Sequence, residues 1–313
     1  KLMSEGIKTV HIPMHGFYDI YSLIKLVYFL KKFKPDIVRG YLTRGAFYAG
    51  LAAKFVDIPS VGSAHSTNTW KHFKWVDKII TVSDAVNIFL KSKGYQEERL
   101  IRIYNGVDIK PKNIEDRIKI RQELGIAENE VVFGMISRII HDKGHDIALE
   151  AFVKAGRPGK LVIVGDYNTD FGDFLMQKVE ELNLNGYVIW TGQKDDVFPY
   201  LTSFDVFLAP SRREAMSLSI IEAMGMGLPI IGSKVGGNPE QIEHGKNGFL
   251  FTSENAEEMG QYMKILENDK DMRMRFGEYS KEKYLSTFSG DIFYRNVLNV
   301  FEDLIKEKKY GKN

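Results

Sequence analysis

The sequence predicts an α/β protein with two doubly wound domains, each built around a parallel β-sheet. Short apolar segments of strand length alternate with helical segments along most of the chain. In the second half, polar or glycine-containing loops follow the predicted strands directly, which is typical of parallel sheets that bind ligands at their carboxyl edge. The length of 313 residues suits two domains of about 150 residues each.

Composition and spacing exclude several classes of protein. The absence of cysteine excludes disulfide frameworks and thiolate zinc sites, and it indicates a reducing compartment. No apolar run reaches the ~18 residues of a membrane-spanning helix. His141 and His145 have the spacing of a metal pair on a helix, but Gly144 lies between them, so we predict no metal there. No Gly-x-Gly-x-x-Gly follows a predicted strand, which argues against an NAD-dependent dehydrogenase.

Residues 1–110 are predicted to form the first domain. The segment 18–33 is expected to be an amphipathic helix with its leucines on one face. The other expected elements are strands at 8–13, 35–38, 60–64, 78–82 and 100–104, and helices at 44–56 and from Ser83 or Asp84 to Gly94. His65 directly follows the strand at 60–64, so it is expected at the ligand-binding edge of the sheet.

A polar segment with a proline, residues 110–116, is the predicted linker. The second domain, residues 111–289, is expected to hold strands at 131–137, 161–164, 188–190, 206–209, 229–232 and 249–251. Five residues follow these strand ends and are expected on one edge of the sheet: Arg138, Asp166, Gly192, Glu214 and Gly236. The chain beyond residue 253 is expected to be helical.

Two stretches of the second domain predict a ligand site. Glu214 is expected on a loop, and Glu222 in the first two turns of the helix that follows. The start of that helix should offer the free N–H groups of Met216, Ser217 and Leu218 to an anion or to sugar hydroxyls. Arg138 and Lys143 share another strand-to-helix loop, where two cations suit a diphosphate, although an isolated pair of this kind is more often simply solvated.

The segment PSRREAMSLSIIEAMGMGLPIIGSKVGG, residues 210–237, resembles the donor-site signature of retaining GT-B glycosyltransferases of family 4. The resemblance implies a GT-B fold of two doubly wound Rossmann-like domains facing across a cleft, with a final helix, residues 290–313, crossing back to the first domain. Family members begin with a strand, a glycine-rich loop, a helix and a second strand before the equivalent of Lys8. We therefore expect the first domain to lack its opening βα unit.

The resemblance implies a metal-independent, retaining hexosyl- or N-acetylhexosaminyltransferase that needs no cofactor. Its donor would be a nucleoside-diphosphate sugar, with UDP favoured over GDP, and its acceptor a glycan or lipid-linked molecule in polysaccharide or lipopolysaccharide synthesis. His65 and Glu214 would be the catalytic residues, both contacting the transferred sugar. The donor-binding residues would be Arg138, Lys143, Lys194, Glu214, Met216, Ser217, Leu218 and Glu222, with Glu222 on the ribose and Lys194 in the loop beside the base.

Other functions remain compatible with this pattern. A nucleotide-sugar epimerase, or a transferase of the glycogen or sucrose type, would use the same fold. A non-catalytic relative would keep donor binding and act as a subunit of a larger complex.

The first half is basic, with 17 Lys and Arg against 9 Asp and Glu, whereas residues 111–313 carry 26 against 32. Lysines and aromatic side chains cluster on and after the predicted helix 18–33: Tyr21, Lys25, Tyr28, Phe29, Lys31, Lys32 and Lys34. This mixture suits an anionic bilayer surface. We expect a cytoplasmic protein that binds the membrane peripherally, and no nucleic-acid partner because no reader motif is present. The alternative is that the aromatics belong to the core and the lysines serve solubility.

Overall fold

The computed structural model describes residues 6–311. The chain divides into two compact units, one formed by Lys1–Ile103 with Arg295–Asn313 and the other by Tyr104–Tyr294. This division falls between Ile103 and Tyr104, before the expected linker. Lys110 forms an ion pair of 2.5 Å with Asp196, and helix α4 begins at Ile114, so the segment 110–116 is part of the second unit.

The first unit contains a four-stranded parallel sheet in which each strand lies next to its successor along the chain, in the order β1-β2-β3-β4. The strands are β1 (Val38–Tyr41), β2 (Ser60–Ala64), β3 (Lys78–Thr81) and β4 (Leu100–Arg102). The helices are α1 (Ile20–Phe33), α2 (Leu42–Val56), α3 (Asp84–Ser92), the short η2 (Lys71–Phe73) and η3 (Glu97–Arg99), and the larger part of α12 (Gly290–Tyr310).

The strand predicted at residues 8–13 is wrong. No strand pairs with this segment within the described residues, and side chains bond to main-chain oxygens at its end. The carbonyl oxygen of Pro13 accepts a hydrogen bond of 2.5 Å from Ser22, and that of Met14 accepts one of 3.3 Å from Arg44. A β-branched pattern does not make a strand where no neighbouring strand supplies the ladder.

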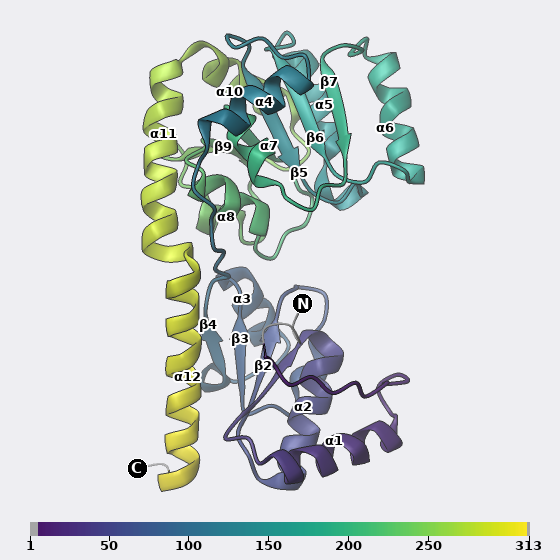
Figure 1. The fold of residues 1–313 in the computed structure, drawn as a ribbon, viewed down its shortest axis with the longest axis vertical. Coiled ribbons are helices and arrows are strands. Elements are labelled where there is room, and N and C mark those ends of the chain that lie inside the picture. Colours follow the sequence, from purple (N-terminus) through teal and green to yellow (C-terminus); the bar gives the residue numbers. More distant parts are fainter. Residues whose placement is uncertain (1–5, 312–313) are drawn as a thin grey trace. The chain divides into compact units, whose positions relative to one another are not determined.

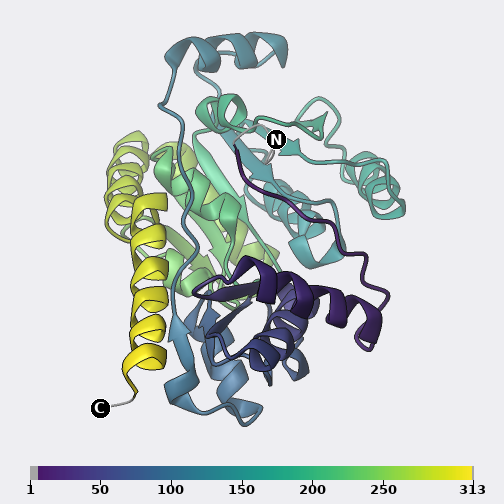
Figure 2. The same ribbon diagram turned by 60° about the horizontal axis from the view of Figure 1, so that its bottom comes forward.

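Helix α1 lies against α2 at the surface of this unit, as Figure 2 shows. The predicted leucine face is the packed one, with Leu30 buried. Asp19 caps the helix by accepting a hydrogen bond from the amide of Ser22. The opposite face carries aromatic rings as well, because Tyr21 and Tyr28 are 66% and 68% exposed. The alternative that these two tyrosines belong to the core is therefore wrong.

The second unit contains a six-stranded parallel sheet in the order β10-β9-β8-β5-β6-β7. All six strands predicted in this half are present: β5 (Val132–Ile136), β6 (Lys160–Val164), β7 (Val188–Gly192), β8 (Val206–Ala209), β9 (Ile230–Ser233) and β10 (Gly248–Phe251). The chain builds outward from β5 through β6 to β7, then returns to the other side of β5 and builds outward again. The direction of winding therefore reverses between β5 and β8, which is the topological switch point of a doubly wound sheet.

Helices cover this sheet, with α6 on the side of β7 and with α4 and α7 packed together (Figure 1). The helices are α4 (Ile114–Glu123), η4 (His141–Lys143), α5 (His145–Lys154), α6 (Asp170–Glu181), α7 (Phe198–Ser203), α8 (Leu218–Gly225), α9 (Asn238–Gln241), α10 (Ala256–Asn268), α11 (Lys270–Lys283) and η5 (Tyr284–Phe288). The core joins α5, α6 and α10 to the strands through fully buried side chains such as Phe152, Leu175 and Met263. This packing holds the loops at the carboxyl edge.

Candidate functional site

The residues predicted to follow strand ends do lie on one edge of the second sheet. Arg138, Asp166, Gly192, Glu214 and Gly236 stand at or just after the carboxyl ends of β5, β6, β7, β8 and β9, and all these strands are parallel. Ligands of doubly wound sheets bind at this edge, next to the switch point. The two loops at the switch point are 137–144, after β5, and 210–217, after β8.

These two loops meet in an ion pair. The Nζ of Lys143 lies 2.5 Å from Oε2 of Glu214, and the two side chains are 20% and 12% exposed. The sequence predicted a separate task for each residue, but in the structure each is the partner of the other. A half-buried pair of this kind is held in one geometry, which makes it suitable for orienting a polar ligand.

The Val235-Gly-Gly stretch explains how Glu214 is held. Gly236 has a φ of +50°, and a Cβ there would collide with the carbonyl oxygen of Glu214. The amide of Gly237 donates a hydrogen bond of 3.3 Å to the same oxygen. Only glycine combines this backbone conformation with so close an approach, so the two glycines fix the main chain at Glu214.

The start of helix α8 differs from the prediction. The side chain of Ser217 caps the helix by accepting a hydrogen bond of 3.3 Å from the amide of Ile220. The amide of Ser217 is not free, because it donates to Oε1 of Gln241 at 3.2 Å, while Nε2 of Gln241 donates to the Ser217 carbonyl at 2.8 Å. A buried glutamine thus occupies one of the three amides predicted to donate hydrogen bonds to the ligand. The amides of Met216 and Leu218 remain as predicted donors.

Glu222 lies in the second turn of α8. No group in the described part of the chain donates a hydrogen bond to its carboxylate. Burial raises its pKa to about 7. The side chain is therefore suited to accept hydrogen bonds from a ligand that supplies hydroxyl groups.

A cavity of about 480 Å³ opens at the carboxyl ends of β5, β6 and β7. Arg138 and Lys194, both predicted donor-binding residues, line it together with Asp166, Gln193 and Thr169. Lys194 lies 5.4 Å from the ring centre of Tyr200. The structure therefore brings the predicted residues together in two clusters of the same edge, this cavity and the Lys143–Glu214 pair.

His145 is a residue for which the sequence predicts no role, because no metal site is expected at His141 and His145. It is fully buried at the start of α5, and its Nε2 lies 3.0 Å from the hydroxyl of Ser137. Burial lowers its pKa to about 4, so the ring is neutral at physiological pH. Its contact joins the two ends of the loop that carries Arg138 and Lys143.

His65 stands at the carboxyl end of β2 in the first unit, as predicted. Its ring stacks on that of Tyr41, with centroids 6.4 Å apart, and the Arg39 guanidinium lies 4.3 Å from the Tyr41 centroid. Burial, and secondly the charge of Arg39, lower the pKa of His65. Its contact with a donor sugar stays a prediction.

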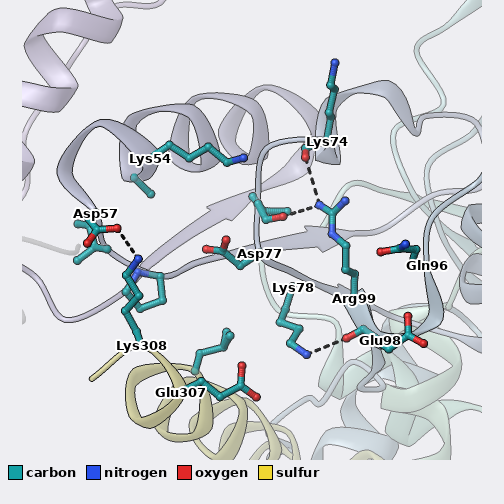
Figure 3. A pocket seen from close by; sticks show the side chains of 15 residues that line it. Lys54, Asp57, Lys74, Asp77, Lys78, Gln96, Glu98, Arg99, Glu307 and Lys308 are labelled. Atoms are coloured by element: carbon teal, nitrogen blue, oxygen red, sulfur yellow. Dashed lines mark hydrogen bonds and ion pairs between the residues drawn. The ribbon is translucent and has the colours of Figure 1, made fainter. Parts of the chain in front are cut away.

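The first unit also has a cavity of about 1010 Å³, shown in Figure 3, at the amino ends of β2 and β3. Several of its basic side chains bond to main-chain oxygens: Lys78 donates to the Glu98 carbonyl at 2.8 Å, and Arg99 to those of Lys74 and Val76. These bonds brace neighbouring loops. Because the cavity lies at the edge opposite His65, we do not assign the predicted ligand to it.

Within residues 6–311, no group of three or more His, Asp or Glu side chains is arranged to hold a metal ion. None of the helices described here is long and apolar enough to cross a bilayer.

Comparison with known families gives two matches along the chain. Residues 116–283 match the model described as glycosyl transferases group 1, and residues 5–110 match that of glycosyltransferase family 4. The first match alone covers more than half of the chain.

Individual proteins agree with these matches. The chain is 28% identical over 265 residues to N-acetyl-alpha-D-glucosaminyl L-malate synthase of Bacillus anthracis, covering 82% of this chain and 68% of the relative. It is 23% identical to the N,N'-diacetylbacillosaminyl-diphospho-undecaprenol alpha-1,3-N-acetylgalactosaminyltransferase of Campylobacter jejuni, over 98% and 88% of the two chains. The crystal structure of Anabaena HepE in complex with UDP-glucose has a TM-score of 0.86 at 22% identity, covering 96% of this chain and 88% of that one. This likeness shows that the chain has the GT-B fold.

Proposed function

The chain belongs to the group 1 glycosyl transferases, and from that premise we propose that it transfers a hexose or N-acetylhexosamine from a UDP-sugar with retention of anomeric configuration. The proposed acceptor is a glycan or lipid-linked molecule of cell-surface polysaccharide synthesis. The observation that carries the proposal is the Lys143–Glu214 pair at the switch point of the second sheet. This pair supports the proposal because a cation suited to phosphate lies beside a carboxylate suited to sugar hydroxyls.

In the proposed reaction, a hydroxyl oxygen of the acceptor attacks the anomeric carbon on the face from which UDP departs. The bond from that carbon to the phosphate oxygen breaks as the new glycosidic bond forms, and the hydroxyl proton passes to an oxygen of the β-phosphate. Lys143 and Arg138 stabilise the charge that builds on the diphosphate, with the amides at the start of α8. These cations take the place that a metal ion has in other transferases.

The remaining residues hold the two ends of the donor. Glu222 accepts hydrogen bonds from the ribose hydroxyls, for which its half-buried carboxylate, without a donor among residues 6–311, is suited. Lys194 and Arg138 line the 480 Å³ cavity, which we assign to the nucleotide end of the donor. Glu214 holds hydroxyls of the sugar, and His65 is kept as a second proposed contact of the sugar.

Turnover of purified protein tests this proposal. UDP-glucose and UDP-N-acetylglucosamine are incubated with the protein, with and without EDTA, and NMR follows the anomeric configuration of the sugar that is released or transferred. The proposal expects UDP release that EDTA does not abolish, with the configuration retained. Inversion would overturn the mechanism. UDP binding without any turnover would favour a donor-binding subunit, and interconversion of UDP-sugars without UDP release would favour an epimerase.

We also propose that the first unit binds an anionic membrane surface through α1, on the cytoplasmic side. The exposed Tyr21 and Tyr28 supply apolar area next to lysines, and Lys25 lies 4.3 Å from the ring centre of Tyr21. Aromatic rings beside lysines suit the interface of a bilayer. A lipid-linked acceptor would reside at that interface.

A further inference from the structure

Arg212 joins four segments of the second unit. All five N–H donors of its guanidinium are used: two on the Asp146 carboxylate, two on that of Glu254, and one on the carbonyl of His141. These hydrogen bonds measure 2.6–3.0 Å, and the Arg212 side chain is only 13% exposed. Its main-chain amide adds a bond of 2.8 Å to the carbonyl of Asp142. Such a fully used fork permits one geometry only.

Arg212 is the first of three consecutive residues that each take a partner on the loop after β5. Arg213 pairs with the Asp142 carboxylate at 3.0 Å, and Glu214 pairs with Lys143 at 2.5 Å. Gly144 adds a steric constraint, because its φ is +69° and a Cβ there would collide with the carbonyl oxygen of Pro210. The loops after β5 and β8 are thus attached to one another at each of the residues 141–144.

The three attachments differ in burial. The Arg213 side chain is 70% exposed and has one carboxylate partner, so its contribution is small. The Lys143–Glu214 pair belongs to the donor site itself. Arg212 is the only one of the three that is buried and also reaches outside the predicted donor contacts, to α5 through Asp146 and to the start of α10 through Glu254.

We infer that Arg212 is a positioning residue that sets the distance between the phosphate-binding cation Lys143 and the sugar-binding carboxylate Glu214. The inference rests on the proposed function of this site. Arg212 contacts no group expected to touch the donor, but the main-chain bonds to His141 and Asp142 fix the turn directly before Lys143. Without the guanidinium, the loop 137–144 loses the hydrogen bond at the His141 carbonyl and the ion pair with Asp146 directly after it, so Lys143 and Glu214 are held less rigidly relative to one another.

Two measurements on Arg212→Met test the inference. Hydrogen exchange of residues 138–146 should become faster, while exchange in β5 and β6 stays the same. Calorimetry with UDP should show a dissociation constant raised about tenfold. Arg213→Met is the matched control and should leave both measurements within about twofold of wild type, because an exposed ion pair contributes little to stability.

A second control separates positioning from a general loss of stability. Arg121 is another buried arginine, bonded to Asp205 at 2.6 Å, and Arg121→Met should lower the melting temperature without faster exchange at 138–146 beyond that of the rest of the unit. Arg212→Lys keeps the positive charge but loses the five guanidinium donors. Hydrogen exchange at 138–146 should therefore be as fast as in Arg212→Met. Asp146→Asn in the Arg212→Met background should add little, because the two residues act together.

Unchanged exchange at 138–146 in Arg212→Met would overturn the inference, as would full recovery by Arg212→Lys. If wild-type protein binds neither UDP nor GDP, the proposed function fails instead, and the exchange measurement still decides the role of Arg212.

Discussion

The carboxyl edge of the second sheet and the outer face of α1 both carry basic side chains, but they hold them in opposite ways. At the edge, Lys143 and Arg212 are buried to 20% and 13% exposure and are paired with carboxylates. On α1, the lysines are exposed beside tyrosines that are themselves exposed. The first arrangement fixes each cation in one place, whereas the second leaves it free in solvent.

The difference teaches what each region can do. A buried, hydrogen-bonded cation costs desolvation and is useful only where geometry matters, as in orienting a diphosphate. An exposed cation acts through long-range attraction, which salt screens over about 8–10 Å. We therefore expect the edge to recognise a specific small ligand, and α1 to recognise an extended surface.

Removing both cations predicted to bind phosphate should have the largest effect on ligand binding at the carboxyl edge. Arg138→Ala with Lys143→Ala should weaken UDP binding by about 2–4 kcal/mol, because two charge-assisted contacts are lost. Titration calorimetry with UDP and GDP measures the effect. The exposed Lys264, changed to Ala on α10, is the control. Equal affinities in the double variant and the wild type would remove both residues from the site.

Glu222 gives the edge a predicted pH dependence. Its folded pKa of about 7 lies above the ordinary value of 4.5, so the folded protein binds more protons than the unfolded chain between these pH values. Stability should therefore fall as pH rises from 4.5 to 7, and the cost is complete above pH 7.

The variant Glu222→Gln should abolish this fall and be more stable than wild type at pH 8, on the order of 3 kcal/mol, with little difference at pH 4. Denaturant unfolding across pH measures it, and Glu180→Gln, on the exposed side of α6, is the control. UDP binding by wild type should tighten as pH rises through 7, because the ionised carboxylate is the better acceptor. A flat profile for both properties would contradict the burial of this group.

Glu214→Gln tests whether sugar binding and nucleotide binding at the carboxyl edge depend on different residues. Turnover should fall about a hundredfold because the sugar loses a carboxylate contact. UDP affinity should stay the same or rise, because Lys143 no longer has a competing partner at 2.5 Å. Steady-state kinetics and calorimetry on one preparation separate the two effects. Glu222→Ala should weaken UDP binding because the ribose contacts are lost, and an equal loss of UDP affinity in Glu214→Gln would refute the division of labour between the two glutamates.

The smallest effects are expected on α1, where no single residue dominates. Replacing Lys31, Lys32 or Lys34 singly by Gln should weaken binding to phosphatidylserine-containing vesicles by about 1 kcal/mol each. Co-sedimentation at rising salt concentration measures this, and wild-type binding should fade as salt screens the surface. Lys264→Gln serves as the control. No binding of wild type at low salt would remove the membrane proposal and leave the sugar-transfer proposal standing.

Sequence patterns predicted the six strands of the second unit because each is an apolar run bounded by polar or glycine-containing loops. They also placed Arg138 and Glu214 on one edge, since parallel strands end there together. They did not predict the strand order, and so could not show that Lys143 and Glu214 would meet across the switch point. Strand order depends on contacts between distant segments, which a local pattern does not contain.

The errors have the same origin. Residues 8–13 have the composition of a strand, but no neighbouring strand pairs with them, and the oxygens of Pro13 and Met14 at their end bond to Ser22 and Arg44. The sequence predicts a free amide at Ser217, but in the structure this amide donates a hydrogen bond to the side chain of Gln241. Arg212 and Arg213 are adjacent and identical in type, and nothing local distinguishes the buried one from the exposed one.

The pairing of Lys143 with Glu214 also affects how fast an anionic donor reaches the site. A cation neutralised at 2.5 Å projects little field into solvent. The chain from residue 111 onward has 26 basic against 32 acidic side chains, so its net charge does not attract an anion either. The association rate should therefore depend little on salt concentration. The donor interacts with Lys143 only once it is bound. Discrimination between nucleotides should therefore depend on the dissociation rate of the bound nucleotide.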